Sequence, residues 1–117
     1  MTSLIRARGL SFELRADEAD AVIDGRRADL SRREYQVLSV LAEAANEVIP
    51  RELIYERVWQ RPARRKGRSV DEVVATLRIK IEQVAPQWEF IHTRWGIGYW
   101  FAPQRRGTAA RAVHRGT

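Results

Sequence analysis

The chain of 117 residues contains no cysteine, two histidines and no apolar run long enough for a membrane-spanning helix. Without cysteine, neither disulfides nor thiolate metal sites can form, which favours a reducing compartment. The first twelve residues, MTSLIRARGLSF, lack the continuous apolar block of a signal peptide. We therefore expect a cytoplasmic protein that does not enter membranes.

Signatures of catalysis are also missing from the sequence. It holds no set of nucleophile, base and orienting residue, no glycine-rich phosphate loop before a helix, and no cluster with metal-ligand spacing. His92 and His114 stand alone, one in an expected strand and one near the C-terminus. We predict no enzyme activity, no cofactor and no metal site.

Positive charge is concentrated in the second half of the chain. Up to Glu56, eight arginines and no lysine stand against eleven acidic residues, a net charge of −3. From Arg57 onward, thirteen basic residues stand against four acidic ones, a net charge of +9. This asymmetry favours a polyanionic partner, nucleic acid before an anionic membrane surface. The alternative is that the surplus arginine only solvates the surface.

The first thirty residues predict a small antiparallel sheet. Gly9, a polar stretch and the pair Asp24-Gly25 separate four short, partly alternating runs: SLIRA, LSFEL, AVID and RADL. An Asp-Gly pair between such runs is a strong hairpin signal, because a primed two-residue turn needs a positive φ at both positions.

A helical period replaces this alternation after residue 30. Ser31 and Glu34 fit a capping box, Leu30 fits a hydrophobic staple with Tyr35, and Asn46 can close the helix in the left-handed conformation. The face expected to be buried carries Tyr35, Leu38, Leu41, Ala42 and Ala45.

Two further helices are expected. The segment VIPRELIYERVWQ predicts about ten helical residues, and Pro50 suits the first turn because proline lacks the amide hydrogen that a helix start leaves unused. The third helix, 69–84, would begin with a second capping box of Ser69 and Glu72 and end before Pro86. The apolar positions expected in the core are Leu53, Ile54 and Val58 in the second helix, and Val70, Val74, Leu77, Ile81 and Val84 in the third.

The remainder predicts a β-hairpin and a tail. EFIHTR and YWFA are β-prone, and WGIGY between them supplies two glycines for a turn. We expect an N-terminal sheet over 1–30, a three-helix core and wing over 31–102, and a flexible basic tail over 103–117. This order is typical of an α+β fold, the winged helix-turn-helix. In that fold the third helix enters the major groove and the wing, here 90–101, meets the minor groove or the backbone.

Four motifs resemble the winged-helix effector domain of OmpR/PhoB-type response regulators of bacterial two-component systems. VIDGRRADLSRREYQVLSVLAE is similar to that family's strand, turn and first helix, IPRELIYERVW to its second helix, RSVDEVVATLRIKI to its recognition helix, and FIHTRWGIGYWF to its wing. The resemblance extends from about Leu10 to Phe101 and implies sequence-specific binding of double-stranded DNA and regulation of transcription. No receiver domain precedes it, so we expect either a fragment of a longer regulator or a free-standing binder controlled in another way.

The resemblance also implies which residues contact DNA. Carried over position by position, it gives phosphate contacts at Trp59, Arg68, Arg78 and Tyr99, and base contacts at Val73 and Thr76. Residue chemistry adds Glu72, which can accept a hydrogen bond from cytosine. Charge and position give the other candidates: Arg64, Arg65 and Lys66 in the loop, Ser69 and Lys80 in the third helix, and Arg94 and Trp95 in the wing.

The sequence departs from the family pattern in the wing and in the loop. Trp95 stands where the family usually has an arginine, and Arg94 comes one position earlier. Adjacent strand residues point to opposite faces, so either can reach the minor groove but not both in the same way. The loop 60–67, QRPARRKG, is basic, which predicts that it grips the DNA backbone rather than RNA polymerase.

Several alternatives stay open. Glu72 is equally explained as a capping residue, and Trp59 as a core residue. The weakly charged centre of the third helix leaves room for a protein-docking winged helix, because a fold does not fix a function. No bidentate arginine–guanine pair is evident, which predicts modest specificity for each subunit and tandem or dimeric binding. RNA polymerase stays a further candidate partner.

Overall fold

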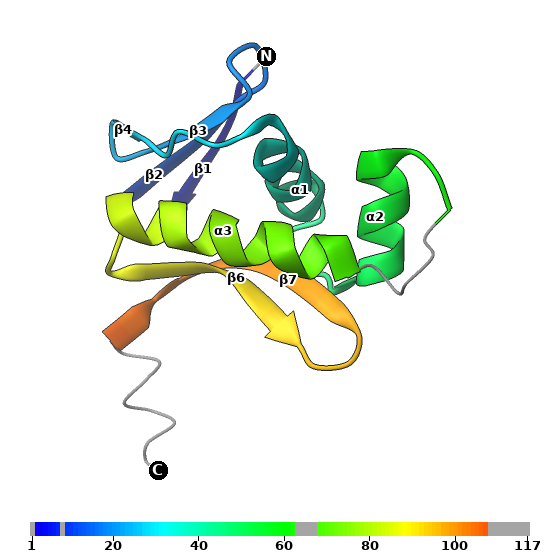
Figure 1. Ribbon diagram of the computed structural model, residues 1–117. Coiled ribbons are helices and arrows are strands. Elements are labelled where there is room, and N and C mark those ends of the chain that lie inside the picture. Colours follow the sequence, from blue (N-terminus) through cyan, green and yellow to red (C-terminus); the bar gives the residue numbers. More distant parts are fainter. Residues whose placement is uncertain (1, 8, 63–67, 108–117) are drawn as a thin grey trace.

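The computed structural model describes residues 2–7, 9–62 and 68–107, and within these residues three helices and two antiparallel sheets pack together (Figure 1). The first sheet consists of β1 (Thr2–Ala7), β2 (Leu10–Arg15), β3 (Asp20–Ile23) and β4 (Arg26–Arg27). The helices are α1 (Arg32–Glu43), α2 (Arg51–Trp59) and α3 (Arg68–Val84). The second sheet consists of β5 (Ile49–Pro50), β6 (Trp88–Arg94) and β7 (Gly98–Arg105), in the order β5-β7-β6. The expected α+β winged helix-turn-helix is confirmed.

The N-terminal sheet folds as its turn residues predict. Asp24 and Gly25 have φ values of 49° and 83°, the positive angles that a primed turn between β3 and β4 needs. The Asp24 carboxylate also accepts a hydrogen bond from the Ser11 amide at 2.8 Å, which ties the turn to β2. Alternate residues of β2 are buried, so one face of this sheet covers the core.

Helix α1 starts at the expected capping box. Ser31 Oγ accepts from the Glu34 amide at 3.1 Å, and a Glu34 carboxylate oxygen accepts from the Ser31 amide at 2.7 Å. Asn46, with a φ of 71°, has the expected left-handed conformation, but it does not close the helix as expected, because α1 ends at Glu43 with Ala44 as its C-cap. The expected face was partly wrong: Val37 is fully buried because α1 packs against α2 and α3 as well as β7, whereas Ala45 lies beyond the helix and is exposed.

Helix α3 begins one residue earlier than expected. Because Arg68 is its first residue, Ser69 lies inside the helix, and the second capping box of Ser69 with Glu72 is wrong. The acidic residue of the first turn whose side chain forms hydrogen bonds is instead Asp71, which accepts from Arg51 of α2 and Tyr99 of β7. The expected apolar face is confirmed at Val70, Val74, Leu77 and Ile81, which are buried, while Val84 is partly buried.

Aromatic residues join the two sheets through the core. Phe12 of β2 lies 5.2 Å, between ring centroids, from both Phe90 of β6 and Phe101 of β7. Such tilted aromatic contacts stabilise a core beyond the area that they bury. The wing sheet is therefore packed onto the same core as the N-terminal sheet.

The base of the wing includes a strand that the sequence did not predict. Ile49 and Pro50 precede α2 and pair with Tyr99 and Gly98 of β7. A Cβ added at Gly98 would lie 2.0 Å from the Ile49 carbonyl oxygen, so only glycine permits this approach. The hairpin thus stands on a tightly packed base.

The expected start of the tail at residue 103 was wrong. Strand β7 continues to Arg105, and the Arg106 amide donates to the Gln87 carbonyl at 2.8 Å. Gln104 and Arg105 belong to the strand because they pair with Glu89 and Trp88, the first residues of β6. Residues 108–117, the rest of the expected tail, lie outside the described residues.

Candidate nucleic-acid interface

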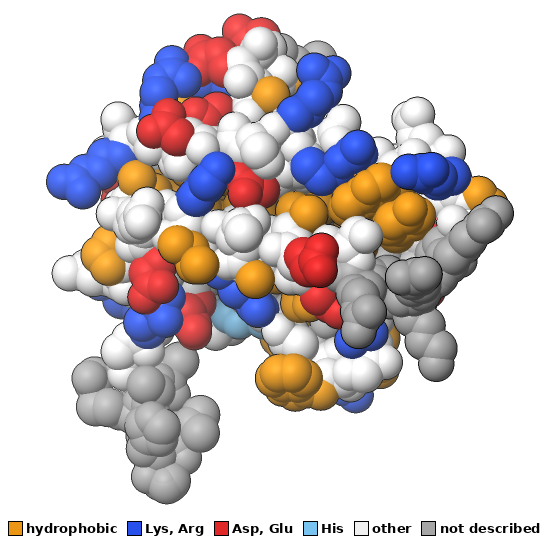
Figure 2. Space-filling view, in the orientation of Figure 1, with side chains coloured by type: hydrophobic (Ala, Val, Ile, Leu, Met, Phe, Trp, Pro, Cys, Tyr) orange, Lys and Arg blue, Asp and Glu red, His pale blue; other side chains and the backbone are white. Residues whose placement is uncertain are grey.

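The outer face of α3 carries the residues expected to read bases. Glu72 and Thr76 are exposed, and Val73 is partly buried against the core. Thr76 Oγ1 donates to the Val73 carbonyl at 3.0 Å, a bond within the helix, and its hydroxyl also lies close enough to the Glu34 carboxylate to help lower the pKa of Glu34. Figure 2 shows hydrophobic side chains along this helix and at the tip of the hairpin below it, interspersed with charges of both signs. The face offers hydroxyl, carboxylate and apolar groups at helical spacing.

Lys80, a candidate phosphate contact, connects α3 to α1. Its ammonium group donates to the Glu34 carboxylate at 2.8 Å and to the Asp29 carbonyl at 3.2 Å. Burial of Glu34 favours a higher carboxyl pKa, but the hydrogen bonds from Lys80 and from the Ser31 amide outweigh it, so the pKa of Glu34 is lowered. Lys80 therefore has a structural role whether or not it also reaches DNA.

Asp71 connects the first turn of α3 to α2 and to the wing. One of its carboxylate oxygens accepts from Arg51 Nε at 3.0 Å and from the Tyr99 hydroxyl at 2.5 Å. Burial, and then the hydrogen bond to Asp71, raise the pKa of Tyr99 to about 12, so its hydroxyl stays protonated. The hydroxyl that was expected to reach a phosphate has a partner within the protein.

Arg78 holds the middle of α3 against the wing. Its Nη2 donates to the Ile91 carbonyl at 3.0 Å and to Thr93 Oγ1 at 2.7 Å, and its guanidinium lies 5.5 Å from the centre of the Tyr99 ring. Burial lowers the pKa of this guanidinium, although Tyr99 and Glu89 oppose the shift. The geometry gives Arg78 the role of a support for the wing, and its phosphate contact stays a prediction.

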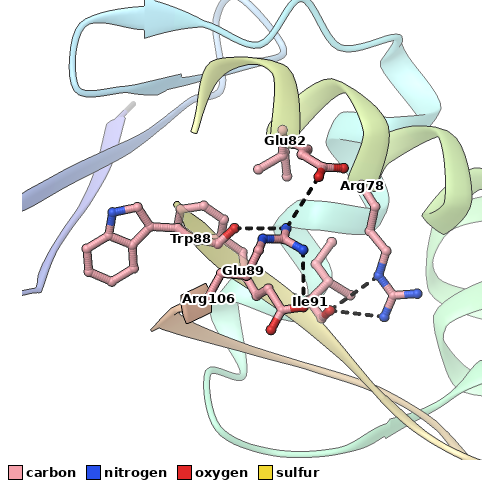
Figure 3. Close-up of a pocket in the computed structure, with 8 residues that line it drawn as sticks. Arg78, Glu82, Trp88, Glu89, Ile91 and Arg106 are labelled. Atoms are coloured by element: carbon pink, nitrogen blue, oxygen red, sulfur yellow. Dashed lines mark hydrogen bonds and ion pairs between the residues drawn. The ribbon is translucent and has the colours of Figure 1, made fainter. Parts of the chain in front are cut away.

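A small cavity lies on the inner side of α3, beside β6 (Figure 3). Its volume is about 130 Å³, and Arg106 spans it with the guanidinium directed toward Glu82 and Glu89, at N–O distances of 4.0 Å and 3.5 Å. Arg106 also donates to the Trp88 carbonyl at 3.3 Å. These contacts fasten the end of β7 to α3, and the cavity is separate from the outer face.

The tip of the wing exposes an indole. Arg94, Trp95, Gly96 and Ile97 form the turn, in which the Ile97 amide donates to the Arg94 carbonyl at 2.9 Å and Gly96 has a φ of 79°. The side chain of Arg94 is exposed, and Trp95 is 87% exposed. Both wing candidates are therefore accessible to a ligand.

Trp59, at the end of α2, lies in an aromatic stack. Its ring is parallel to that of Tyr55 at 4.7 Å, and the Arg33 guanidinium covers it at 4.6 Å. Arg33 also donates to the Val58 carbonyl at 3.1 Å. Trp59 is partly buried, which is compatible with both of the roles considered for it.

The described residues bring together only part of the expected site. Glu72, Val73 and Thr76 share the outer face of α3, whereas Arg64, Arg65 and Lys66 lie outside the described residues. Arg68 and Ser69 form the first turn of α3, and of Arg68 only the backbone is described. Sequence reasoning missed three supporting residues: Arg33, Arg51 and Asp71. Asp71 could have been found as an acidic residue in a first turn, but its partners are 20 and 28 positions away.

The described ranges contain neither a candidate metal site nor a membrane-spanning helix. Within residues 2–7, 9–62 and 68–107, no three His, Cys, Asp or Glu side chains form a group suited to a metal ion. No helix in the same ranges has the length and apolar character to cross a bilayer.

Comparison with known proteins identifies the family. The family model described as "Transcriptional regulatory protein, C terminal" matches residues 25–101, from the β3–β4 turn into β7 of the wing. The chain belongs to this family. Its members are OmpR/PhoB-type DNA-binding domains of bacterial response regulators, so the resemblance seen in the sequence is confirmed, and the family is one of transcription factors rather than enzymes.

Individual relatives support the same assignment. The chain is 38% identical over 79 residues to the transcriptional regulatory protein ResD of Bacillus subtilis, a match over 67% of this chain and 33% of ResD. The chain thus spans about a third of the length of that relative.

Solved structures share the fold. The response regulator DrrB of Thermotoga maritima, an OmpR/PhoB homologue, aligns over 85% of this chain and 44% of its own, with a TM-score of 0.67 and 32% identity. The DNA-binding domain of Klebsiella pneumoniae RstA, solved in complex with the RstA box, aligns over 87% of this chain and 99% of its own, with a TM-score of 0.71 and 24% identity.

Proposed function

We propose that this domain binds double-stranded DNA in a sequence-specific manner and regulates transcription, with α3 in the major groove and the β6–β7 wing at the minor groove. The observation that carries the proposal is the outer face of α3: it is exposed, while Lys80, Asp71 and Arg78 hold its flanks to the rest of the protein. A helix fixed in this way presents its side chains without further ordering, which favours specific contacts. The related RstA DNA-binding domain, solved in complex with the RstA box, supports DNA binding by this chain.

The proposed division of roles follows from side-chain chemistry. Glu72 accepts from cytosine N4, Thr76 bonds to a base edge or touches a thymine methyl, and Val73 makes apolar contact only. Phosphate contacts provide affinity without sequence information. Their candidates are Trp59, Arg64, Arg65, Lys66, Arg68, Ser69 and Arg94, with Arg78, Lys80 and Tyr99 as contacts that also have partners inside the protein.

Specificity for each domain is expected to be modest. None of the three base readers can make the bidentate arginine–guanine pair, which contributes about 1–3 kcal/mol of discrimination. Two copies on adjacent half-sites would supply the missing selectivity. We therefore include tandem or dimeric binding in the proposal. The proposal also includes a location in the cytoplasm and contact with RNA polymerase, as expected from the sequence.

The first experiment is a titration of duplex DNA at several salt concentrations. If roughly five phosphates are neutralised, log K should fall against log salt with a slope of about −4 to −5. Selection of sites from a random duplex pool would then give the motif, and Thr76→Ala should change the preferred base at one position. Binding that stays absent even at low salt would overturn the proposal.

The basic loop needs its own test. The triple variant Arg64→Ala, Arg65→Ala, Lys66→Ala should bind all sequences more weakly and flatten the salt slope by up to about 3. A charge-matched control removes three exposed arginines of the N-terminal sheet, Arg6, Arg26 and Arg27. An equal effect of both triple variants would mean that net charge, and not a loop contact, sets the affinity.

A protein-docking module is the second candidate function. Its support is the exposed apolar surface, because Ile79 on α3 is 57% exposed and Trp95 on the wing is 87% exposed. Large exposed apolar side chains are typical of protein interfaces when they are contiguous. Salt-insensitive behaviour toward DNA would favour this candidate.

A further inference from the structure

The exposure of Trp95 is unexplained by the fold. Among the large hydrophobic side chains in the described residues, Trp95 is the most exposed, at 87%, and its neighbour Ile97 is 45% exposed. The turn itself requires only Gly96, whose φ is 79°. A tryptophan exposed to water does not contribute the favourable free energy that burial of its large apolar surface would give. An exposed indole at the tip of a turn therefore favours a binding role.

The tip is mounted on a fixed base. The Ile97 carbonyl accepts from the Arg51 amide at 3.1 Å, and Gly98 packs directly against the Ile49 carbonyl. On the opposite side of the hairpin, Arg78 holds the Ile91 carbonyl and Thr93 to α3. The indole is therefore presented at a defined distance from the outer face of α3, and little ordering is needed when a ligand binds.

The chemistry of the tip differs from that of a charged minor-groove reader. An indole has no positive charge, so it gains nothing from the negative potential of a narrow groove, which attracts arginine. It offers a flat apolar surface and a single N–H donor. Apolar side chains that enter a minor groove act by inserting between base pairs and partly unstacking them. The exposed Arg94 beside it supplies a charge for the adjacent phosphates.

We propose that Trp95 enters the minor groove as an apolar wedge that partly unstacks one base step, and that this unstacking adds a sequence preference at the wing. The inference rests on the proposed DNA-binding function and names how its wing acts. The preferred step is a pyrimidine–purine step, because TA and CA/TG steps are the most easily kinked. The affinity that the wedge contributes comes from stacking and apolar contact, so it is independent of salt.

Binding measurements separate a wedge from a charge contact. On the duplex selected by the wild-type protein, Trp95→Ala should bind about tenfold more weakly, the order of effect of losing one base–aromatic stack, with an unchanged salt slope. Trp95→Arg should instead make the slope more negative by about 0.9, the value for one added phosphate contact. Leu4→Ala removes an exposed apolar side chain from β1, which is 49% exposed there, and should bind like the wild-type protein.

Unstacking is read with 2-aminopurine placed at each pyrimidine–purine step of the selected duplex in turn. Its fluorescence should rise at one step with the wild-type protein and should stay low with Trp95→Ala and Trp95→Arg. Equal affinity of Trp95→Ala and wild type, or the same fluorescence response with both, would overturn the wedge while duplex binding by the wild-type protein still upholds the proposed function. Failure of the wild-type protein to bind any selected duplex would overturn the proposed function itself.

Discussion

The two sheets of this domain end in comparable turns that carry opposite kinds of side chain. The β3–β4 turn exposes Asp24 and Gly25, and the Asp24 carboxylate accepts from the Ser11 amide. The β6–β7 turn exposes Trp95 and Ile97, which have no such capping contact among the described residues. Both turns use a glycine with positive φ. The backbone thus explains the glycines, and it leaves the exposed apolar residues of the second turn to be explained by the proposed contact of Trp95 with DNA.

The two hairpins are alike at their turns, because a Cβ added at Gly25 or at Gly96 would meet nothing within 4 Å. At Gly98, in the base of the wing, an added Cβ would instead meet the Ile49 carbonyl oxygen at 2.0 Å. The N-terminal hairpin is open to solvent at its turn, and the wing is packed against the start of α2. The predictions below change one side of this comparison at a time.

The largest effect is expected from Gly98→Ala. The added methyl group would overlap backbone atoms of Ile49 and Pro50, which cannot move without breaking the pairing of β5 with β7, so a loss of about 3 kcal/mol or more is expected. Gly25→Ala, where only the positive φ is strained, should cost about 1–2 kcal/mol. Urea unfolding of both variants measures the difference, and equal losses would contradict the tight base of the wing.

Lys80→Met is expected to have the next largest effect. It removes the ammonium group that neutralises the buried Glu34 carboxylate and that connects α3 to Asp29, between β4 and α1. Since Lys80 is partly exposed, the loss should be about 2 kcal/mol, below the roughly 3–5 kcal/mol of a fully buried pair. Lys80→Arg, which keeps the charge, is the control. A loss of DNA affinity without a loss of stability would instead assign Lys80 to the interface.

Tyr99→Phe tests the connection of α3 to the wing sheet. The variant loses the hydrogen bond to the Asp71 carboxylate, for which about 1.5 kcal/mol of unfolding free energy is expected. If the hydroxyl serves only Asp71, the salt slope of DNA binding stays the same. A flatter slope with unchanged stability would restore the phosphate contact that the family resemblance implies.

The smallest effect is a pH dependence from Glu34. Because its pKa in the folded protein is lowered, its contribution to stability is complete above the ordinary carboxyl value of about 4.3 and is lost as the pH falls through the folded pKa. The variant Glu34→Gln should therefore show a flatter fall in unfolding free energy between about pH 5 and pH 3 than the wild-type protein. Parallel curves would show that other carboxyl groups govern acid unfolding.

Patterns among neighbouring residues predicted the β3–β4 turn and the N-terminal cap of α1. They did not predict contacts between residues that are distant in the sequence. Asp24-Gly25 and the Ser31–Glu34 box depend on neighbouring residues only, and both were found where the sequence placed them. Strand β5 and the Arg51–Asp71–Tyr99 contacts join residues that the fold alone brings together, and no periodicity reveals them.

The same limit explains the errors. Ser69 and Glu72 satisfy the spacing of a capping box, yet the helix starts at Arg68, and Asp71 is the residue whose side chain binds other elements. The end of the wing was placed too early because the residues after Pro103 have little apolar surface to bury, whereas β7 continues to Arg105 opposite Trp88. The family resemblance and the charge and position of the residues supplied the candidate DNA contacts, and the structure added that three of them, Arg78, Lys80 and Tyr99, have partners within the protein.

Chemical-shift mapping with the selected duplex tests the central claim most directly, because both sheets and α3 are observed at once. The account predicts large shifts at Glu72, Thr76 and Trp95, with the amides of β1 to β4 unchanged. Shifts confined to the N-terminal sheet, or an outer face of α3 that stays silent at saturating DNA, would contradict it.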